Sequence, residues 1–156
     1  MIYTKTGDKG ETRVFDPKTK KLIAVSKASD LINTIGVIDE LNSLLGVIGG
    51  MTDIQGDLFT INAILAGTKL NFGKAKTIKL EKEIDRLEKI LPVQKNFIYY
   101  GGDPKAAMLF FARAVCRRAE RCVVSLPDLI ANHQVASFAY RYQLITYLNR
   151  LSDYLF

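Results

Sequence analysis

Apolar side chains recur every three or four residues along most of this chain, and that spacing predicts helices rather than strands. In residues 31–48 the resulting stripe consists of Leu31, Ile35, Ile38, Leu41, Leu45 and Ile48. Similar stripes predict four further helices, at about 53–70, 78–91, 104–125 and 132–156. Five helices joined by short connections are typical of an up-and-down bundle, so we expect an all-α five-helix fold. Strands do not alternate with these helices, which argues against a doubly wound α/β fold.

Residues that begin and end helices lie between the stripes. Ser29 and Asp53 precede the first two stripes, where each side chain can cap a helix, and Asp103 is followed by Pro104 at a first helical position. The breakers between the helices are Gly49–Gly50, Asn71–Lys74, Pro92 and Pro127. We therefore expect a single domain over 1–156, with the bundle in 29–156.

The first 28 residues differ from the rest, because they are rich in Lys, Thr, Gly and Asp and lack helical periodicity. They predict an ordered loop, with at most short β-like pieces such as Thr12–Phe15. Tyr3–Arg13 has the composition of a phosphate-binding loop, in which glycines leave backbone N–H groups free to face oxygens. It lacks the Gly-Lys-Ser/Thr of a Walker A loop, and Thr6–Gly10 alone is more typical of a surface turn.

Charge and composition narrow the class of protein only in part. The formal net charge of +6 fits an anionic ligand, and it fits nucleic acid or a membrane surface equally well. No apolar run reaches the roughly 18 residues of a membrane span, and Met1 is not followed by a secretory leader, so we expect a cytoplasmic protein. Cys116 and Cys122 are expected to be reduced thiols. His133 is the only histidine, which argues against a histidine-based metal site.

Residues 112–121 place four arginines and one glutamate in an alanine-rich run. Arg113, Arg117 and Arg121 recur every four residues, so they share one face of a helix and repel one another unless an anion lies among them. Glu120 can relieve part of the repulsion. Apolar neighbours such as Phe111 predict that the helix is largely buried, and a polyphosphate would suit its guanidinium forks. A solvated basic face, or a surface that binds nucleic acid, is the alternative.

Polar residues inside two of the predicted helices are further candidates for the site. Asp39 lies on a stripe of small and acidic residues of the first predicted helix, where a buried carboxylate needs a cation from the arginine helix. A structural salt bridge explains it equally well. Asn149, Ser152 and Asp153 lie at helical spacing among apolar residues, where polar groups are satisfied by neighbours or reserved for a ligand. Lys27, by itself, would be an unremarkable surface lysine.

Three motifs in combination, Tyr3–Gly10, Ala112–Arg121 and Leu148–Phe156, closely resemble the PduO-type ATP:cob(I)alamin adenosyltransferases. Residues 38–43 and 95–98 also look like that family. The resemblance implies a five-helix bundle that assembles as a homotrimer with active sites between subunits. It implies transfer of the 5′-deoxyadenosyl group of ATP to the cobalt of a reduced corrinoid, which forms adenosylcobalamin and triphosphate. The implied co-substrate is ATP with Mg²⁺, and the implied acceptor is cobalamin.

The resemblance also implies roles for particular residues. The N-terminal ATP loop would consist of Thr4, Lys5, Thr6, Gly7, Thr12 and Arg13, with Lys27 as a phosphate lysine. The helix residues that match those holding ATP and magnesium are Arg117, Arg118, Glu120 and Arg121, with Glu120 as the metal ligand. Asn149 would lie at the nucleotide, and Asp39 and Arg113 would form a pair that bridges subunits. Phe97 would occupy the lower face of the cobalt.

The chain departs from the family pattern after Phe97, where Tyr99-Tyr100 stands in place of the leucine-proline of many relatives, and it stops at Phe156, where many relatives continue. These departures leave open an alternative, a catalytically impaired ATP- and corrinoid-binding regulator or carrier. For an active enzyme we expect a corrinoid reductase and an adenosylcobalamin-dependent enzyme as partners. Neither nucleic acid nor a membrane is expected.

Overall fold

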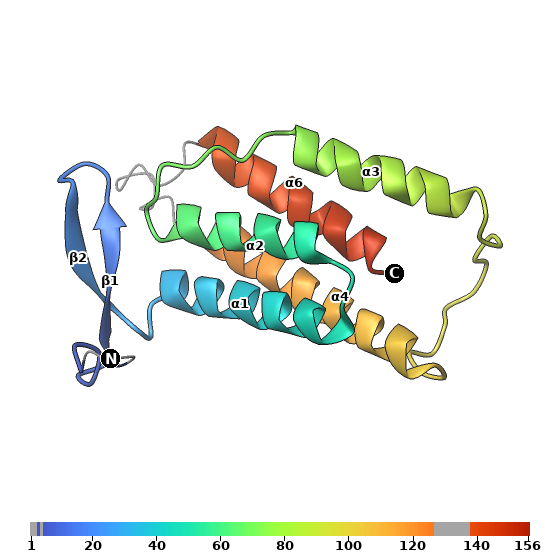
Figure 1. The fold of residues 1–156 in the computed structure, drawn as a ribbon, viewed down its shortest axis with the longest axis horizontal. Helices are drawn as coiled ribbons and strands as arrows, with labels where there is room; N and C mark the ends of the chain where they lie inside the picture. Colours follow the sequence, from blue (N-terminus) through green and yellow to red (C-terminus); the bar gives the residue numbers. More distant parts are fainter. Residues whose placement is uncertain (1–2, 4, 127–137) are drawn as a thin grey trace.

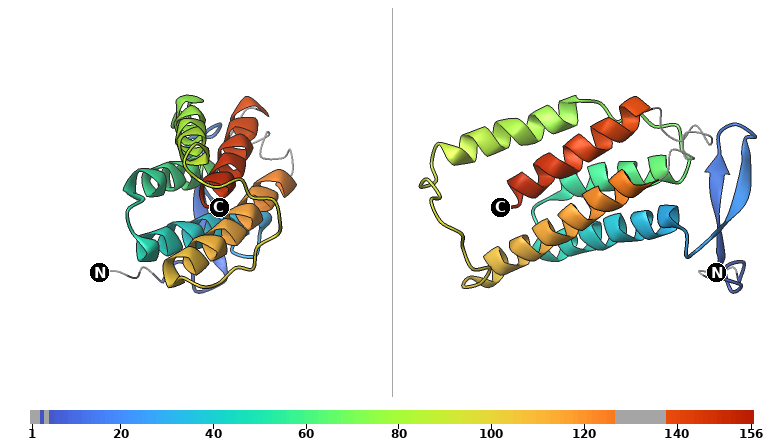
Figure 2. Two further views of the ribbon diagram at one scale, coloured as in Figure 1. Left: turned by 90° about the vertical axis from the view of Figure 1, so that its right-hand side faces the viewer. Right: turned by 180° about the vertical axis from the view of Figure 1, so that it is seen from behind.

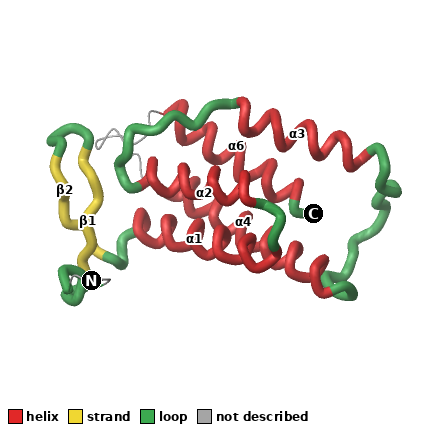
Figure 3. The backbone as a smooth tube through the Cα atoms, viewed as in Figure 1, coloured by secondary structure: helices red, strands yellow, loops and turns green. Residues whose placement is uncertain are grey.

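The computed structural model describes residues 3, 5–126 and 138–156. Its five described helices are α1 (Asp30–Ile48), α2 (Thr52–Leu65), α3 (Ala75–Glu88), α4 (Pro104–Ser125) and α6 (Phe138–Tyr154). A hairpin of β1 (Glu11–Asp16) and β2 (Lys21–Ser26) precedes them. The helices lie roughly side by side, and the hairpin lies beyond the end of the bundle where α1 begins (Figures 1 and 3). The predicted five-helix bundle is confirmed, with a small sheet added.

The helix boundaries follow the capping chemistry in some places and not in others. Ser29 and Asp103 cap α1 and α4 as predicted, because their side chains accept hydrogen bonds from backbone N–H groups three residues later. The prediction for Asp53 is wrong, since α2 begins at Thr52 and Met51 provides no side-chain cap. The second helix also ends at Leu65 rather than 70, and the third spans Ala75–Glu88 rather than 78–91. The predicted start of the last helix, 132–135, lies outside the described residues.

The hairpin corrects the expectation of a loop over residues 1–28. β1 pairs antiparallel with β2, with Thr12 opposite Val25 and Val14 opposite Ile23. At the turn, the Asp16 carboxylate accepts hydrogen bonds from the backbone N–H of Lys18 at 2.9 Å and from the hydroxyl of Thr19 at 2.8 Å. An aspartate that folds the chain back in this way is a recognised turn former. In the sequence, Asp16-Pro17 between two apolar stretches was the available signal for a hairpin.

One backbone contact fixes the hairpin against the bundle. The N–H of Phe15 donates to the carbonyl of Ala66, just after α2, at 2.9 Å. The next residue, Gly67, has a φ of 100°, a conformation that side-chain-bearing residues rarely adopt. A Cβ atom at Gly67 would lie only 1.8 Å from the carbonyl oxygen of Phe15. Glycine is therefore required here both by the backbone angle and by the approach of β1.

We expect Gly67→Ala to lower the free energy of unfolding by about 1–3 kcal/mol, because alanine is strained at this φ and its methyl group overlaps β1. Urea denaturation followed by circular dichroism measures the effect. Gly73→Ala is the matched control, since Gly73 has no neighbouring atom within 4 Å of the added methyl group and no positive φ. Equal stability of the two variants would contradict the docking described here.

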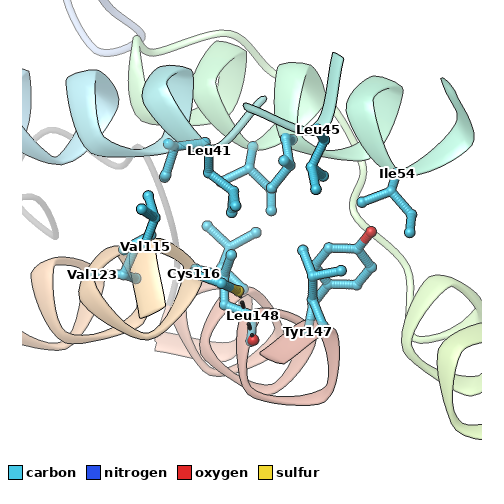
Figure 4. Close-up of a cluster of buried hydrophobic side chains, with 14 of the residues drawn as sticks. Leu41, Leu45, Ile54, Val115, Cys116, Val123, Tyr147 and Leu148 are labelled. Carbon is cyan, nitrogen blue, oxygen red and sulfur yellow. Dashed lines mark hydrogen bonds between the residues drawn. The ribbon is translucent and has the colours of Figure 1, made fainter. Parts of the chain in front are cut away.

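The hydrophobic core lies where α1 and α2 meet α4 and α6 (Figure 4). Leu41 and Leu45 of α1 face Val115 and Cys116 of α4, and Leu148 of α6 closes the cluster. α3 packs mainly against α6, and seen from the side or from behind it stands apart from α1 (Figure 2). The thiol of Cys116 donates to the carbonyl of Leu148 at 3.2 Å, and burial raises the pKa of this thiol.

By length and composition alone, α1 is long and apolar enough to cross a membrane, which differs from the expectation that no run reaches that length. Its Ile38, Leu41 and Leu45 are fully buried in the bundle core. Asp39 and Glu40 interrupt its middle and are exposed. These features are those of a core helix whose other face is not covered by the described residues.

Candidate functional site

The arginines of α4 form an exposed face, not a buried one. Arg117, Arg118 and Arg121 are exposed, and Arg113 is half-buried. The buried side of α4 is made by Ala112, Val115, Cys116, Ala119 and Val123. The prediction of a largely buried arginine helix is therefore wrong, because these apolar residues occupy the opposite face and the flanking Phe111 and Val124 are themselves exposed.

Two of these arginines have no partner in the described chain. Arg118 forms an ion pair with Glu40 of α1. Arg117 and Arg121 make no ion pair or hydrogen bond with any described residue, although they lie one turn apart on the same face. Glu120 does not pair with Arg117 as expected and instead accepts a hydrogen bond from Asn149. Two exposed guanidinium groups side by side are thus available to bind an anion.

Asn149 connects α4 to α6 and α3 through a chain of hydrogen bonds. Its amide nitrogen donates to Oε1 of Glu120 at 3.1 Å, and its amide oxygen accepts from Arg150 at 2.9 Å. Arg150 in turn donates from Nε to Glu81 of α3 at 3.0 Å. A carboxylate on one side and a guanidinium on the other define which way the amide points. The sequence indicated Asn149 but not Arg150, whose partner Glu81 is distant along the chain.

The N-terminal segment is folded around Lys27, just after β2. The Lys27 ammonium donates to the carbonyl of Gly7 at 2.9 Å, and the backbone N–H of Lys27 donates to the carbonyl of Gly10 at 2.8 Å. The exposed ammonium keeps two further N–H donors for another acceptor. Among the other predicted loop residues, Lys5, Thr6 and Arg13 are exposed and Thr12 is half-buried, whereas Thr4 lies outside the described residues.

Asp39 and Arg113 are not paired within one chain. Asp39 is exposed on α1 and has no ion-pair partner among the described residues, so the expectation of a buried aspartate is wrong for the single chain. Arg113 lies over the ring of Phe156 at 5.3 Å, and its Nη1 is 3.4 Å from the hydroxyl of Tyr100. Its Nε is buried without a hydrogen-bond partner in the described part of the chain. Neither Asp39 nor Arg113 thus has an ion-pair partner among the described residues.

The segment between α3 and α4, residues 89–103, is here called the Phe97 loop. Phe97 and Tyr99 are fully exposed, at 107% and 101%. Below the loop lies a cavity of about 480 Å³, within the size range of ligand pockets. Its apolar wall is made by Ile84, Leu87, Leu91, Pro92, Ile98, Tyr154 and Phe156. Arg113 and Asp153 supply charge at the same cavity.

The N-terminal segment and the Phe97 loop lie at opposite ends of the bundle (Figures 1 and 2). The 22 residues of α4 run between these ends and span about 33 Å. Within one chain Asn149 thus contacts Glu120, beside the exposed arginines of α4, whereas the Phe97 loop lies at the opposite end of the bundle from the Lys27 segment. No group of three or more metal-ligating side chains occurs among the residues described.

Comparison with known proteins covers nearly the whole chain. A sequence model of a family described as cobalamin adenosyltransferase matches residues 2–156. The corrinoid adenosyltransferase of Bacillus subtilis (strain 168) is 35% identical over 173 aligned residues, which cover 99% of this chain and 82% of that protein. The cobalamin adenosyltransferase of Cupriavidus metallidurans is 34% identical over 167 aligned residues, covering 99% of this chain and 84% of that one.

Solved structures agree with the sequence relatives. A variant of the PduO-type ATP:corrinoid adenosyltransferase from Lactobacillus reuteri, complexed with cobalamin and ATP, superposes with a TM-score of 0.82 at 31% identity, covering 100% of this chain and 87% of that one. Another variant of that protein, complexed with ATP, gives a TM-score of 0.81 at 32% identity, covering 99% and 90%. The similarity thus includes both sequence and arrangement of helices.

Proposed function

Since this chain belongs to the cobalamin adenosyltransferase family, we propose that its exposed arginine face holds the triphosphate of ATP while the adenosyl group passes to a corrinoid. ATP-dependent adenosylation of a corrinoid is the activity of the family. In full, the 5′-deoxyadenosyl group is transferred to the cobalt and triphosphate leaves. The observation that carries the proposal is the pair Arg117 and Arg121, exposed and unpaired beside Glu120, whose orientation Asn149 fixes.

The residues suit a reaction that needs no general base. Reduced cobalt is itself the nucleophile and is supplied by the substrate, so the protein's part is binding, orientation and electrostatics. Negative charge builds on the leaving triphosphate as the bond to the 5′-carbon breaks. Arg117, Arg121 and Lys27 offer fixed positive charge to those oxygens, which stabilises the transition state more than the ground state. The single His133 is not needed in this scheme.

The exposed Phe97 suits the corrinoid side of the site. We place its ring against the lower face of the cobalt, where an apolar group excludes water and the lower axial ligand. An axial donor stabilises Co(II) relative to Co(I). Its loss in a hydrophobic surrounding therefore makes Co(II) easier to reduce. The cavity below the Phe97 loop is lined mainly by apolar side chains, which suit contact with the flat face of a corrin ring.

We propose that complete sites form between copies in a homotrimer. The support is geometric, since Lys27 and Phe97 lie at opposite ends of one bundle and cannot serve one reaction in the same chain. α1 also leaves a face uncovered, where Gly36, Ser43, Gly46 and Val47 are exposed. Small residues let a second helix approach closely. Asp39 on this helix would then reach Arg113 of a neighbouring copy and pair with it.

Glu120 fits the requirements of a magnesium ligand. Mg²⁺ commonly takes one or two carboxylates together with phosphate oxygens and waters, so a single carboxylate beside a triphosphate site can serve as its protein ligand. Asn149 engages Oε1 of Glu120 and leaves the other oxygen to face a cation. The bound metal would neutralise charge on the triphosphate.

We expect Glu120→Gln to raise the half-saturating Mg²⁺ concentration by roughly tenfold or more, because an amide oxygen is a weaker ligand than a carboxylate. Titration of activity against Mg²⁺ at fixed ATP measures the change. Glu83→Gln is the control, since Glu83 lies on α3 in a surface pair with Arg86. An unchanged magnesium requirement in Glu120→Gln would remove Glu120 from the metal site.

The test of the function is an anaerobic assay with purified protein, Mg-ATP and chemically reduced cob(I)alamin. We expect loss of the Co(I) spectrum, a light-sensitive alkyl-cobalt product and one equivalent of triphosphate. If ATP and corrinoid bound without transfer, the alternative of a regulator or carrier would replace the enzyme. Tyr99-Tyr100 would then be the first residues to replace with the leucine-proline of the family pattern.

Further proposals concern the surroundings of the enzyme. We propose a cytoplasmic location, which the two free thiols Cys116 and Cys122 support. A corrinoid reductase and an adenosylcobalamin-dependent enzyme would supply the substrate and take the product. Neither nucleic acid nor a membrane is part of the proposal, because the basic residues on α4 are committed to a phosphate site.

A further inference from the structure

The Phe97 loop is attached to α4 by one aromatic residue near its end. The ring of Tyr100 stacks on Phe110 of α4 with centroids 4.6 Å apart and an interplanar angle of 26°. Its hydroxyl also lies 3.4 Å from Nη1 of Arg113. The preceding ring, Tyr99, is fully exposed.

The same contact reaches the cavity below the loop. Phe110 packs edge-on against Phe156 with centroids 5.9 Å apart, and Arg113 lies over Phe156 at 5.3 Å. Arg113 and Phe156 both line the cavity, as does Ile98, two residues before Tyr100. Tyr100 therefore contacts Phe110 and Arg113 of α4, on one side of the cavity, through its ring and its hydroxyl. Along the chain it is close to Ile98, the loop residue that lines the other side.

We propose that Tyr100 is a positioning residue that latches the Phe97 loop onto α4 and thereby sets the affinity of the site for the corrinoid. The proposal rests on the placement of Phe97 at the corrinoid given above. Held at Tyr100, the loop keeps Ile98 over the cavity and limits where Phe97 can move. Without the latch, the loop is ordered only when substrate binds, and the entropy of ordering it reduces affinity.

The test compares Tyr100→Ala with Tyr99→Ala, which removes the same kind of ring from the neighbouring position where it makes no ring contact. We expect the KM for the corrinoid to rise about 3- to 10-fold in Tyr100→Ala, because the free energy of one stacked aromatic pair corresponds to a change in affinity of that size. The KM for ATP should be unchanged, and the thermal midpoint should fall by no more than the loss of one aromatic contact predicts. Tyr99→Ala should resemble the parent protein, and Tyr100→Phe, which keeps the ring, should recover most of the corrinoid affinity.

A second readout does not depend on turnover. Lys95 lies exposed in the middle of the loop, so limited trypsin digestion followed by mass spectrometry reports how freely the loop adapts to the protease. We expect cleavage after Lys95 to be about 3- to 10-fold faster in Tyr100→Ala than in the parent or in Tyr99→Ala. Phe110→Leu should also accelerate cleavage after Lys95, and the double variant should be no faster than the faster single variant, because both changes break the stack of Tyr100 on Phe110.

Equal cleavage rates in Tyr100→Ala and the parent protein would overturn the latch, whatever the kinetics. Faster cleavage with an unchanged KM for the corrinoid would overturn its role in substrate affinity. If the parent protein transferred no adenosyl group, the proposed function would fail by itself, and the tryptic rates would still decide whether Tyr100 holds the loop.

Discussion

Replacing Arg117 with alanine is expected to lower kcat/KM for adenosyl transfer by about 10²- to 10³-fold, or about 3–4 kcal/mol. The reason is that Arg117 is exposed on α4 and makes no ion pair with a described residue, so its guanidinium is available to the triphosphate as charge builds on it. For the same reason, the variant should keep its thermal stability. Arg117→Lys should lose less activity, because it retains the charge but not the forked donor geometry.

The measurement is steady-state kinetics with pre-reduced corrinoid, combined with a thermal melt of each variant. Arg86→Ala is the matched control, since Arg86 is an exposed helical arginine whose only described partner is Glu83 in a surface pair of little energetic weight. Near-normal activity in Arg117→Ala would contradict the assigned role. A large drop in melting temperature would show that the residue instead supports the fold.

Phe97→Ala is expected to slow the reaction that starts from Co(II) on the order of 10- to 100-fold, since an apolar group that excludes water and a donor ligand tunes the metal's potential. Binding of ATP should be unaffected, and the reaction from pre-reduced Co(I) should be slowed less. Because Phe97 is fully exposed in the chain, the thermal midpoint should not change.

Comparing the two cobalt oxidation states in one assay distinguishes reduction from transfer, and equilibrium titration measures ATP affinity. Val93→Ala is the control, as Val93 is an exposed apolar side chain of the same loop. If Phe97→Ala weakened ATP binding and left the cobalt chemistry intact, the residue would belong to the nucleotide side of the site.

The helices could be predicted because each buries one apolar stripe and begins or ends with local chemistry. Ser29 and Asp103 cap their helices through hydrogen bonds to residues three positions away, so their roles are visible in a short window of sequence. The β-like piece expected at Thr12–Phe15 lies within β1, but the pairing of β1 with β2 was not predicted, although the turn at Asp16 was a local signal for it. The position of the hairpin on the bundle has no local signature, because it depends on the contact of Phe15 with Ala66, about fifty residues apart.

The site shows the same division between local and distant information. The spacing of Arg113, Arg117 and Arg121 correctly predicted a shared face, since it depends only on helix geometry. The exposure of that face depends on what packs against α4, and the apolar residues around it suggested the wrong answer. Arg150 was missed because its partner Glu81 is distant along the chain and is brought to it only by the packing of α3 against α6. Tyr100 was named only as a departure from the family pattern, and its stack on Phe110 was not predicted because it depends on the path of the loop before α4.

The placement of the Lys27 segment and the Phe97 loop at opposite ends of one bundle has a consequence for symmetry. If a site combines the Lys27 segment of one copy with the Phe97 loop of another, each contact is heterologous, and every copy uses two different surfaces to meet its two neighbours. Repeated contacts of that kind either close into a ring or continue as an open filament. Only closure leaves no unmatched half-site, so the angle between α1 of one copy and α4 of the next determines how many sites each assembly completes.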